Sequence, residues 1–402
     1  MLPGIGVFGT GAIAKVLVPF LKEKGFSVEA IWGVTLQEAE TVAKDLKIPF
    51  FTNKIDDVLL KKNVNLVFIV CAPNLHAQIS VKALGIGKHV VCDKPAGLCQ
   101  AEALKMVRAA QYYPTLISII NHSLRFLPAF SHMKKCILEG YLGNPDELTL
   151  IDVRVQMGSL LGDTYNWLCD DTMGGGTLTL VGSHVIDLVS FLTGQKVIRV
   201  HGVLKTFVTE TLKVNGIRKI TAPDFCTFQL QMDKGLTVTA TLNNHMPGPC
   251  FNQEIYVCSK RGYLVVRGGD LHGKLHKTNL SKSLSEDESK RAHDKEDVIY
   301  VDIEDLSCAS SVVPKPYIKG LCKMISALKE AFLPVKEQMD WIKEPVEAAA
   351  TFEDGQRVQA IMEALRQSNE DGRWTTVRIL TESPDPNPAL SAAVRRTAIS
   401  IQ

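Results

Sequence analysis

Between residues 4 and 120, short apolar runs alternate with segments whose apolar positions recur at helical spacing. Gly4–Phe8 is the first apolar run, and Ala12–Lys22 follows it with the period of an amphipathic helix. The alternation continues with predicted strands at Ser27–Trp32, Leu66–Val70, His89–Cys92 and Leu116–Ile120, and predicted helices at Gln37–Leu46, His76–Leu84 and Gln100–Tyr112. Because alternating strands and helices form a parallel sheet covered on both faces, we predict a doubly wound α/β domain over residues 1–124.

The pattern changes over residues 125–380, where strands follow one another without intervening helices. Predicted strands lie at Glu147–Gln156, Val197–Val203, Phe225–Gln231, Leu236–Leu242, Gln253–Val257 and Tyr263–Val266. Consecutive strands of this kind form an antiparallel sheet, so these residues predict a second α/β domain. Its predicted helices are Leu127–Glu139, Thr177–Leu192, Tyr317–Phe332 and Val346–Ser368. The charged residues 281–297 are expected to form a surface loop, and residues 381–402 a loose tail.

Composition narrows the class of ligand. The 402 residues carry 45 basic and 43 acidic side chains, so the formal net charge is only +2. This balance gives no reason to expect a nucleic acid or an acidic membrane surface as partner, and a small molecule is the expected ligand. The 10 cysteines show no C-x-x-C pair or other metal-ligand spacing, so we expect no metal and a reducing, cytoplasmic location.

The N-terminal residues leave one alternative for the location. Met1–Phe20 is apolar but has no basic start, and we interpret it as folded structure. A secreted protein would require this segment to act as a signal, which would remove the first predicted strand. No apolar run reaches the ~18 residues that are needed to span a bilayer.

A glycine motif connects the first predicted strand to the first predicted helix. The residues Gly9-Thr10-Gly11-Ala12-Ile13-Ala14 read G-x-G-x-x-A. In such a motif the first glycine makes the tight turn, the second lets a pyrophosphate approach the backbone, and the small third residue allows close packing of helix on strand. The phosphates then lie at the helix N-terminus, which favours an anion. The motif and its position predict a Rossmann domain that binds a dinucleotide.

The choice between NAD and NADP is less determined. A carboxylate about 20 residues after the motif would accept the ribose 2′-hydroxyl of NAD. The second strand instead ends in Trp32-Gly33-Val34-Thr35, with neither a carboxylate nor an arginine or lysine. Thr35 can donate one hydrogen bond. Without a repelling carboxylate, the sequence slightly favours NADP over NAD.

Further motifs carry a resemblance to a known family. They are Ala72-Pro73-Asn74-Leu75-His76, Gly87-Lys88-His89-Val90-Val91-Cys92-Asp93-Lys94-Pro95, Met173-Gly174-Gly175-Gly176 and Gly182-Ser183-His184. Together with the glycine motif, they make the chain resemble the glucose-fructose oxidoreductase / inositol dehydrogenase family. The resemblance implies an N-terminal Rossmann domain and a C-terminal α/β domain with a large, mostly antiparallel, open sheet. It also implies hydride exchange between a nicotinamide and the hydroxyl carbon of a sugar or polyol.

The resemblance suggests two catalytic residues. Lys94 matches the lysine of the family's E-K-P motif, here Asp93-Lys94-Pro95, and a desolvated lysine can act as a base. His184 matches the histidine of a D-x-G-x-H segment and would be the second member of a proton relay. The sequence departs from the family at Leu180, where the aspartate of that segment is expected. A leucine cannot bind a hydroxyl group, so one polar member of the relay is missing.

Other positions are expected to contact the cofactor or the substrate. Because ligands of α/β sheets bind beyond the carboxyl ends of the strands, the cofactor is expected at Ala72, Pro73, Asn74, His76, Asp93 and Lys94, besides the glycine motif and Thr35. Candidates for substrate contact are Asn121, His122, Arg125, Tyr165, Trp167 and Asp187. The alternatives are that Asn121, His122 and Arg125 pin the domain junction, that Trp167 packs in the interior, and that Asp187 caps a helix or pairs on the surface. The resemblance further implies a homodimer or homotetramer formed through the C-terminal sheet.

Three functions remain open at this stage. The first is an NAD(P)-dependent oxidoreductase of a sugar or polyol, with Lys94 and His184 as the proton relay. The second is a dinucleotide-binding sensor or scaffold with weakened or lost catalysis, which Leu180 and the unmatched ribose position suggest. The third is redox-assisted glycoside cleavage on a tightly bound NAD, which is known in relatives.

Overall fold

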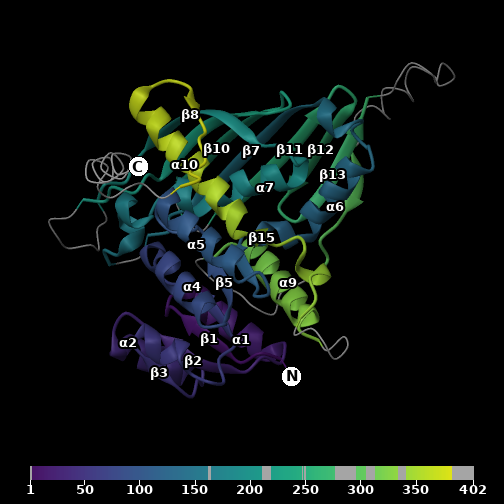
Figure 1. Ribbon diagram of the computed structural model, residues 1–402. Coiled ribbons are helices and arrows are strands. Elements are labelled where there is room, and N and C mark those ends of the chain that lie inside the picture. Colours follow the sequence, from purple (N-terminus) through teal and green to yellow (C-terminus); the bar gives the residue numbers. More distant parts are fainter. Residues whose placement is uncertain are drawn as a thin grey trace, which may run out of the picture.

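The computed structural model describes residues 2–161, 164–210, 219–246, 248, 250–276, 296–304, 313–333 and 341–382. The predicted loop at residues 281–297 lies outside the described residues except for its last two positions, and so does the predicted tail from residue 383 onwards. The described chain forms two sheets, one at the N-terminal end of the molecule and one at the opposite end (Figure 1).

The first sheet, sheet A, has seven strands in the order β15-β6-β5-β4-β1-β2-β3. They are β1 (Ile5–Phe8), β2 (Val28–Trp32), β3 (Phe51–Thr52), β4 (Leu66–Ile69), β5 (His89–Asp93), β6 (Ser118–Asn121) and β15 (Ala350–Thr351). Strands β1 to β6 pair in parallel, and β15 is antiparallel to β6. The order 3-2-1-4-5-6 is that of a Rossmann domain, so the predicted fold of the N-terminal region is confirmed.

The strands of sheet A are short apolar runs because both faces of the sheet are covered. Every residue of β1 and β4 is buried. The helices that follow the strands are α1 (Ala12–Glu23), α2 (Leu36–Asp45), α3 (Ile55–Leu59), α4 (His76–Gly85) and α5 (Gln100–Tyr112). The sequence pattern did not reveal β3 and α3, which have two and five residues and are too short to show a period.

The second sheet, sheet B, has nine strands in the order β14-β13-β12-β11-β7-β10-β9-β8-β16. All neighbours are antiparallel except β10 and β7, so the prediction of a large, mostly antiparallel sheet is confirmed. The strands are β7 (Leu148–Gly158), β8 (Val197–Lys205), β9 (Phe225–Met232), β10 (Thr237–Met246), β11 (Phe251–Ser259), β12 (Gly262–Arg267), β13 (Asp270–Leu275), β14 (Asp297–Tyr300) and β16 (Thr375–Thr376).

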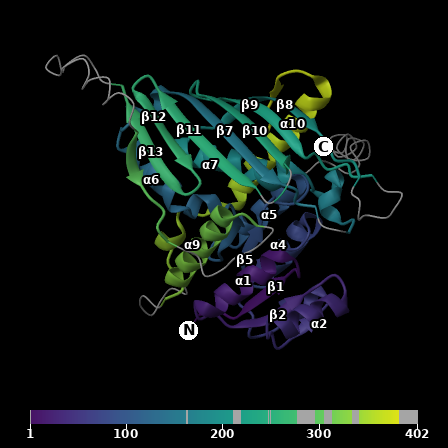
Figure 2. The same ribbon diagram turned by 180° about the vertical axis from the view of Figure 1, so that it is seen from behind.

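Helices cover one face of sheet B. They are α6 (Pro128–Leu138), α7 (Ser183–Thr193) and α10 (Phe352–Asp371), and their apolar residues share one core with the strands. Buried and more exposed residues alternate along β7 and β9, as expected for a sheet with one covered face. The opposite face carries no described helix (Figure 2). A homodimer or homotetramer formed through this face stays a prediction.

The C-terminal part of the chain returns to sheet A. Helix α9 (Lys315–Ala331) buries Ile318, Leu321 and Ile325 in one core with residues of α1. Strand β15 pairs with β6, so it extends the Rossmann sheet at its edge. The domain boundary predicted at residue 124 therefore holds along the sequence only. In space, α9 packs on the Rossmann domain and β15 is a strand of its sheet.

The predicted helix Val346–Ser368 was wrong at its start. Residues Glu344–Val346 form a 3-10 turn, β15 follows, and α10 begins only at Phe352. The Thr351 side chain accepts a hydrogen bond from the Asp354 amide, and the Asp354 carboxylate accepts one from the Thr351 amide. This capping box fixes the helix start, which leaves the preceding residues free to pair with β6.

One helical stretch among the described residues is apolar and long enough to cross a membrane. It is Asp171–Thr193, with a mean hydropathy of 1.3 in its most apolar window. However, 83% of that window is buried inside the protein, and the core helix of a globular domain passes the same test, so this is weak evidence for a membrane span. The cytoplasmic location stays a prediction.

A buried ion pair joins the two parts of the molecule. Arg125 lies in the turn η2 (Ser123–Phe126) after β6, and it donates to both carboxylate oxygens of Asp187 on α7, at 2.8 and 2.6 Å. The side chains of Arg125 and Asp187 are only 8% and 2% exposed. Asp354, at the start of α10, lies 3.2 Å from the same guanidinium group. The turn η2 and the helices α7 and α10 thus meet at the buried guanidinium group of Arg125.

We expect Asp187→Asn to lower the free energy of unfolding by about 3–5 kcal/mol, because the buried guanidinium loses its main counter-charge. Urea denaturation of the full chain measures this change. The matched control is Asp146→Asn, which breaks the exposed pair between Lys234 and Asp146. That variant should change the stability by less than about 1 kcal/mol. Equal effects of the two substitutions would contradict a structural role of the Arg125–Asp187 pair.

Candidate active site

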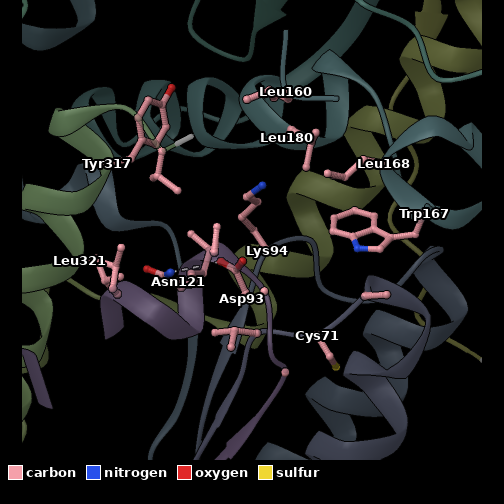
Figure 3. A pocket seen from close by; sticks show the side chains of 18 of the residues that line it. Cys71, Asp93, Lys94, Asn121, Leu160, Trp167, Leu168, Leu180, Tyr317 and Leu321 are labelled. Atoms are coloured by element: carbon pink, nitrogen blue, oxygen red, sulfur yellow. Dashed lines mark hydrogen bonds between the residues drawn. The ribbon is translucent and has the colours of Figure 1, made fainter. Parts of the chain in front are cut away.

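A cleft of about 680 Å³ opens beyond the carboxyl ends of the sheet A strands. The glycine loop, the end of β4 and the end of β5 form its floor, and residues before and within α7 and α9 form its walls (Figure 3). The Rossmann domain and the sheet B domain therefore both contribute to it. Its residues include Gly9, Thr10, Gly11, Ala12, Ile13, Ala72, Asp93, Lys94, Asn121, Trp167, Leu180, His184 and Tyr317.

The glycine loop fits the diphosphate of a dinucleotide. Gly9 has a φ of +132°, and a Cβ there would lie 2.8 Å from the backbone of Val70, so no other residue fits. A Cβ on Gly11 would meet no atom within 4 Å, so that glycine leaves open space above the start of α1. No side chain caps α1 and its first turn has no acidic residue, so its N-terminus is available to an anion. Ala14 is buried beneath the loop and does not line the cleft.

Thr35 was predicted to contact the ribose of the cofactor, but the structure places it elsewhere. Thr35 does not line the cleft, and its side chain caps α2 by accepting a hydrogen bond from the Glu38 amide at 3.2 Å. Val34 and Glu38 line the cleft instead. The carboxylate expected at the end of β2 is instead that of Glu38, in the first turn of the following helix. The pattern Thr35-Leu36-Gln37-Glu38, a capping-box spacing, was the signal that could have revealed it.

Lys94 stands at the end of β5 and reaches into the middle of the cleft. Figure 3 shows its amine pointing toward the space between Tyr317 and Leu180. Burial lowers the pKa of Lys94 from its ordinary value of 10.5, against the opposing charge of Asp93. Asp93 accepts a hydrogen bond from the Asn121 side chain at 3.1 Å, which fixes the carboxylate beside the lysine. An amine with a lowered pKa is suited to exchanging a proton near neutral pH.

His76 lies behind the loop that carries Lys94 and does not line the cleft. Its ring nitrogens lie 2.8 Å from the carbonyl oxygen of Pro95 and 3.0 Å from that of Cys71. The ring therefore ties the end of β4 to the turn that follows β5. Of the other predicted cofactor contacts, Pro73 is buried, Asn74 is exposed and neither lines the cleft, whereas Ala72 and Asp93 do.

His184 faces the cleft from the first turn of α7. Its ring contacts the rings of Tyr317 and His122 edge-on, with centroids 4.9 and 5.5 Å apart. Burial lowers the pKa of His184 well below 6.5, and the charges of Lys94 and His122 lower it further. The imidazole is therefore neutral at pH 7. Its Nδ1 has no hydrogen-bond partner among the described residues.

The predicted substrate residues divide into two groups. Asn121 and Trp167 line the cleft, whereas His122, Arg125, Tyr165 and Asp187 do not. His122 is buried behind His184, and Arg125 and Asp187 bind each other. Arg125 and Asp187 lie 62 residues apart on separate elements, and the sequence did not indicate that they are each other's partner.

Leucines occupy the wall opposite the glycine loop. Leu180 lies in a π-helical turn (Leu178–Gly182) that leads into α7, and it lines the cleft beside Leu160 and Leu168. The position at which the family segment carries an aspartate is thus part of an apolar wall. Among the described residues, no group of three or more His, Cys, Asp or Glu side chains could hold a metal ion.

Comparison with known proteins matches both parts of the chain. Residues 4–120 match the model described as "Oxidoreductase family, NAD-binding Rossmann fold", and residues 130–265 match the "GFO/IDH/MocA C-terminal domain". Glucose-fructose oxidoreductase domain-containing protein 1 of Xenopus tropicalis is 45% identical over 403 residues, which cover 100% of both chains. The human glucose-fructose oxidoreductase domain-containing protein 2 is 43% identical over 98% of this chain and 99% of its own.

A solved structure supports the fold. The structure described as levoglucosan dehydrogenase in complex with NADH and levoglucosan superimposes with a TM-score of 0.74 over 94% of this chain and 100% of its own. Its sequence is only 17% identical to this chain, so the likeness concerns the arrangement of the two domains.

The buried histidines should make stability fall as the solution becomes acidic. Burial lowers the pKa of His76, His122 and His184 from the ordinary 6.5, so they stay neutral in the folded protein while the unfolded chain takes up protons. Below pH 6.5 each should cost up to roughly 1.4 kcal/mol per pH unit until its folded pKa is reached. Denaturant unfolding from pH 7 to pH 5 measures the slope.

We expect His122→Phe, which fills the buried site with a ring that does not titrate, to make this slope shallower. The control is His132→Phe, because His132 is exposed on α6. If the two variants keep the slope of the wild type, the buried His122 does not contribute to acid sensitivity.

Proposed function

Because this chain belongs to the oxidoreductase family with an NAD-binding Rossmann fold, we propose that it transfers hydride between NAD and a carbon atom that carries a hydroxyl group, with Lys94 as the proton acceptor. The observation that carries the proposal is the position of Lys94. It lies in the same cleft as the glycine loop, and burial lowers its pKa.

The residues of the cleft divide the reaction between them. When bound, the nicotinamide ring accepts the hydride that leaves the carbon. Lys94, in its neutral form, accepts the hydroxyl proton at Nζ while the carbon–oxygen double bond forms. The carbon has then lost a hydride and the oxygen a proton, and a carbonyl group remains. His184 is neutral and can hold the hydroxyl group by a hydrogen bond, as the second member of the relay.

The lining of the cleft supports NAD rather than NADP as the cofactor. Glu38 and Val34 lie where β2 meets α2, the region in which Rossmann domains hold the ribose. A carboxylate there accepts the 2′-hydroxyl of NAD and repels a 2′-phosphate. Lys94 is the one lysine or arginine among the described lining residues, and it lies at the end of β5. The slight preference for NADP rested on the end of β2 alone. We therefore propose NAD as the cofactor instead.

A second function has one observation in its favour. Leu180 presents a hydrocarbon where the family segment has an aspartate, so the proton relay lacks a polar member. A protein that binds the dinucleotide without turnover, as a sensor, would tolerate this change. The retained Lys94 and its lowered pKa favour the enzyme, because a sensor needs neither.

We expect Lys94→Met to lower the rate of alcohol oxidation by about 10²- to 10⁴-fold, while NADH still binds. Reduction of NAD with a panel of secondary alcohols, followed at the nicotinamide absorbance, measures the rate. The wild-type rate should rise with pH and level off below pH 10.5, because only the neutral amine accepts a proton.

The control for this variant is Lys105→Met, an exposed lysine of α5. Binding of NADH without oxidation of any alcohol in the panel, and with no difference between Lys94→Met and wild type, would support the sensor and refute the enzyme.

We expect the wild type to bind NADH at least about tenfold more tightly than NADPH, a difference of about 1.4 kcal/mol. Glu38→Gln should reduce this preference, because the charge that repels the 2′-phosphate is removed. Titration of nicotinamide fluorescence measures both dissociation constants. Glu40→Gln is the control on the same helix, where Glu40 pairs with Lys44. Tighter binding of NADPH by the wild type would contradict the role of Glu38.

A further inference from the structure

We infer that the substrate carries its reacting hydroxyl or carbonyl group on an apolar carbon skeleton, not on the polyhydroxylated ring of a sugar or polyol. This inference rests on the proposed function and narrows it to a class of substrate. It follows from which side chains surround Lys94 and from how few of their polar groups are available to a ligand.

Hydrocarbon side chains from three separate segments converge opposite Lys94. Leu160 follows β7, Leu168 belongs to the 3-10 turn Trp167–Cys169, and Leu180 belongs to the π turn before α7. Figure 3 shows Leu160, Leu168 and Leu180 on one side of the lysine, with the Trp167 ring next to them. All four are half-buried, so each leaves part of its apolar surface open to the cleft. A ligand that covers this surface gains free energy only if it is itself apolar there.

The leucines of this wall are held in place by the core of the sheet B domain. Leu160 and Leu180 pack against the buried residues between sheet B and its helices. The amide of Leu180 donates to the carbonyl oxygen of Gly176 at 2.9 Å, which fixes the turn. These side chains therefore belong to a built surface, and a polar ligand cannot simply displace them.

Two polar side chains on these walls are occupied within the protein, while Ser123 and Thr164 also line the cleft. The Tyr317 hydroxyl, which is buried, donates to the Gln253 side chain at 3.3 Å. The Asn166 carbonyl oxygen accepts from the Leu168 amide at 2.9 Å, and its amide group donates to the carbonyl oxygen of Thr164 at 3.3 Å. These contacts use groups that a sugar-binding site would turn toward its ligand.

What remains is a small polar point within an apolar surface. Lys94 and His184 line the cleft together, and Nδ1 of His184 and Oδ1 of the neighbouring Asn121 have no hydrogen-bond partner among the described residues. This pair suits one hydroxyl or carbonyl oxygen. A polyol would carry several more hydroxyl groups against leucine side chains, where they would lose their hydrogen bonds to water without replacement.

The test compares two ketones with the same six-membered ring. The full chain, loaded with NADH, is titrated with cyclohexanone and with 2-keto-myo-inositol, and the change in nicotinamide fluorescence gives the two dissociation constants. We expect cyclohexanone to bind at least tenfold more tightly. In the other direction, NAD reduction should give cyclohexanol a kcat/KM at least tenfold above that of myo-inositol.

A variant tests the wall directly. Leu180→Asp introduces the carboxylate that the family segment carries, and we expect it to shift the ratio of the two dissociation constants at least tenfold toward the inositol ketone. Leu180→Met keeps the wall apolar and should keep the preference for cyclohexanone. If Leu180→Asp fails to fold, as judged by circular dichroism, the wild-type ratio and Leu180→Met still decide the question.

Each outcome separates this inference from the proposed function. Equal or tighter binding of the inositol ketone, or no measurable binding of either ketone, overturns the inference. If myo-inositol is then oxidised in a Lys94-dependent manner, the proposed function stands without it. If cyclohexanone binds more tightly but no alcohol is oxidised, the apolar cleft is supported and the proposed catalysis fails.

Discussion

The arrangement of the cleft depends on the buried contact of Arg125 with Asp187 and Asp354. Arg125 follows the last parallel strand of sheet A, whereas the two carboxylates come from the helices that cover sheet B. His184 lies one helical turn before Asp187, so fixing Asp187 also fixes the histidine relative to Lys94. A hydrophobic contact could slide by a fraction of a side chain. A bidentate ion pair at 2.6 and 2.8 Å allows little such freedom, and it gives the two domains one relative position.

The same exclusion of water that strengthens this contact also controls the protons of the site. Lys94, His122 and His184 lie close together, and burial lowers the pKa of each. Positive charge on one disfavours positive charge on the others, which adds to the effect of burial on His184. A neutral amine beside a neutral imidazole is the state that accepts a proton from a hydroxyl group. The positions of the domains and the chemistry of the cleft therefore have one physical origin, which is the low dielectric of the junction.

The sequence predicted most of what is periodic or local. Strands β1, β2, β4, β5 and β6 of sheet A, strands β7 to β12 of sheet B and the glycine loop were identified, because burial on two faces, burial on one face and a tight turn each leave a pattern in the sequence. The sequence-based predictions failed where a contact between residues far apart in the chain determines the local structure. Residues 346–351 have helical character, yet Ala350 and Thr351 pair with β6, more than 200 residues earlier. Arg125 was expected to contact substrate or to pin the domain junction, and only the three-dimensional structure shows that Asp187 is its partner there. Glu38 was missed because an acid was sought on the strand, one element too early.

Backbone geometry shapes one end of the cleft and side chains shape the other. Family membership therefore indicates the type of reaction more reliably than it indicates which substrate is bound. At the cofactor end the recognition is largely made by backbone: Gly9 requires a positive φ, and Gly11 leaves room for a diphosphate, so almost no variation is possible. At the opposite end the surface consists of side chains such as Leu160, Leu168 and Leu180, so its chemistry depends on which side chains the sequence places there. The levoglucosan dehydrogenase structure, which is only 17% identical, therefore shares the arrangement of the two domains with this chain. With Leu180 in place of a carboxylate, this wall offers hydrocarbon to a ligand, while Lys94 and His184 still line the same cleft.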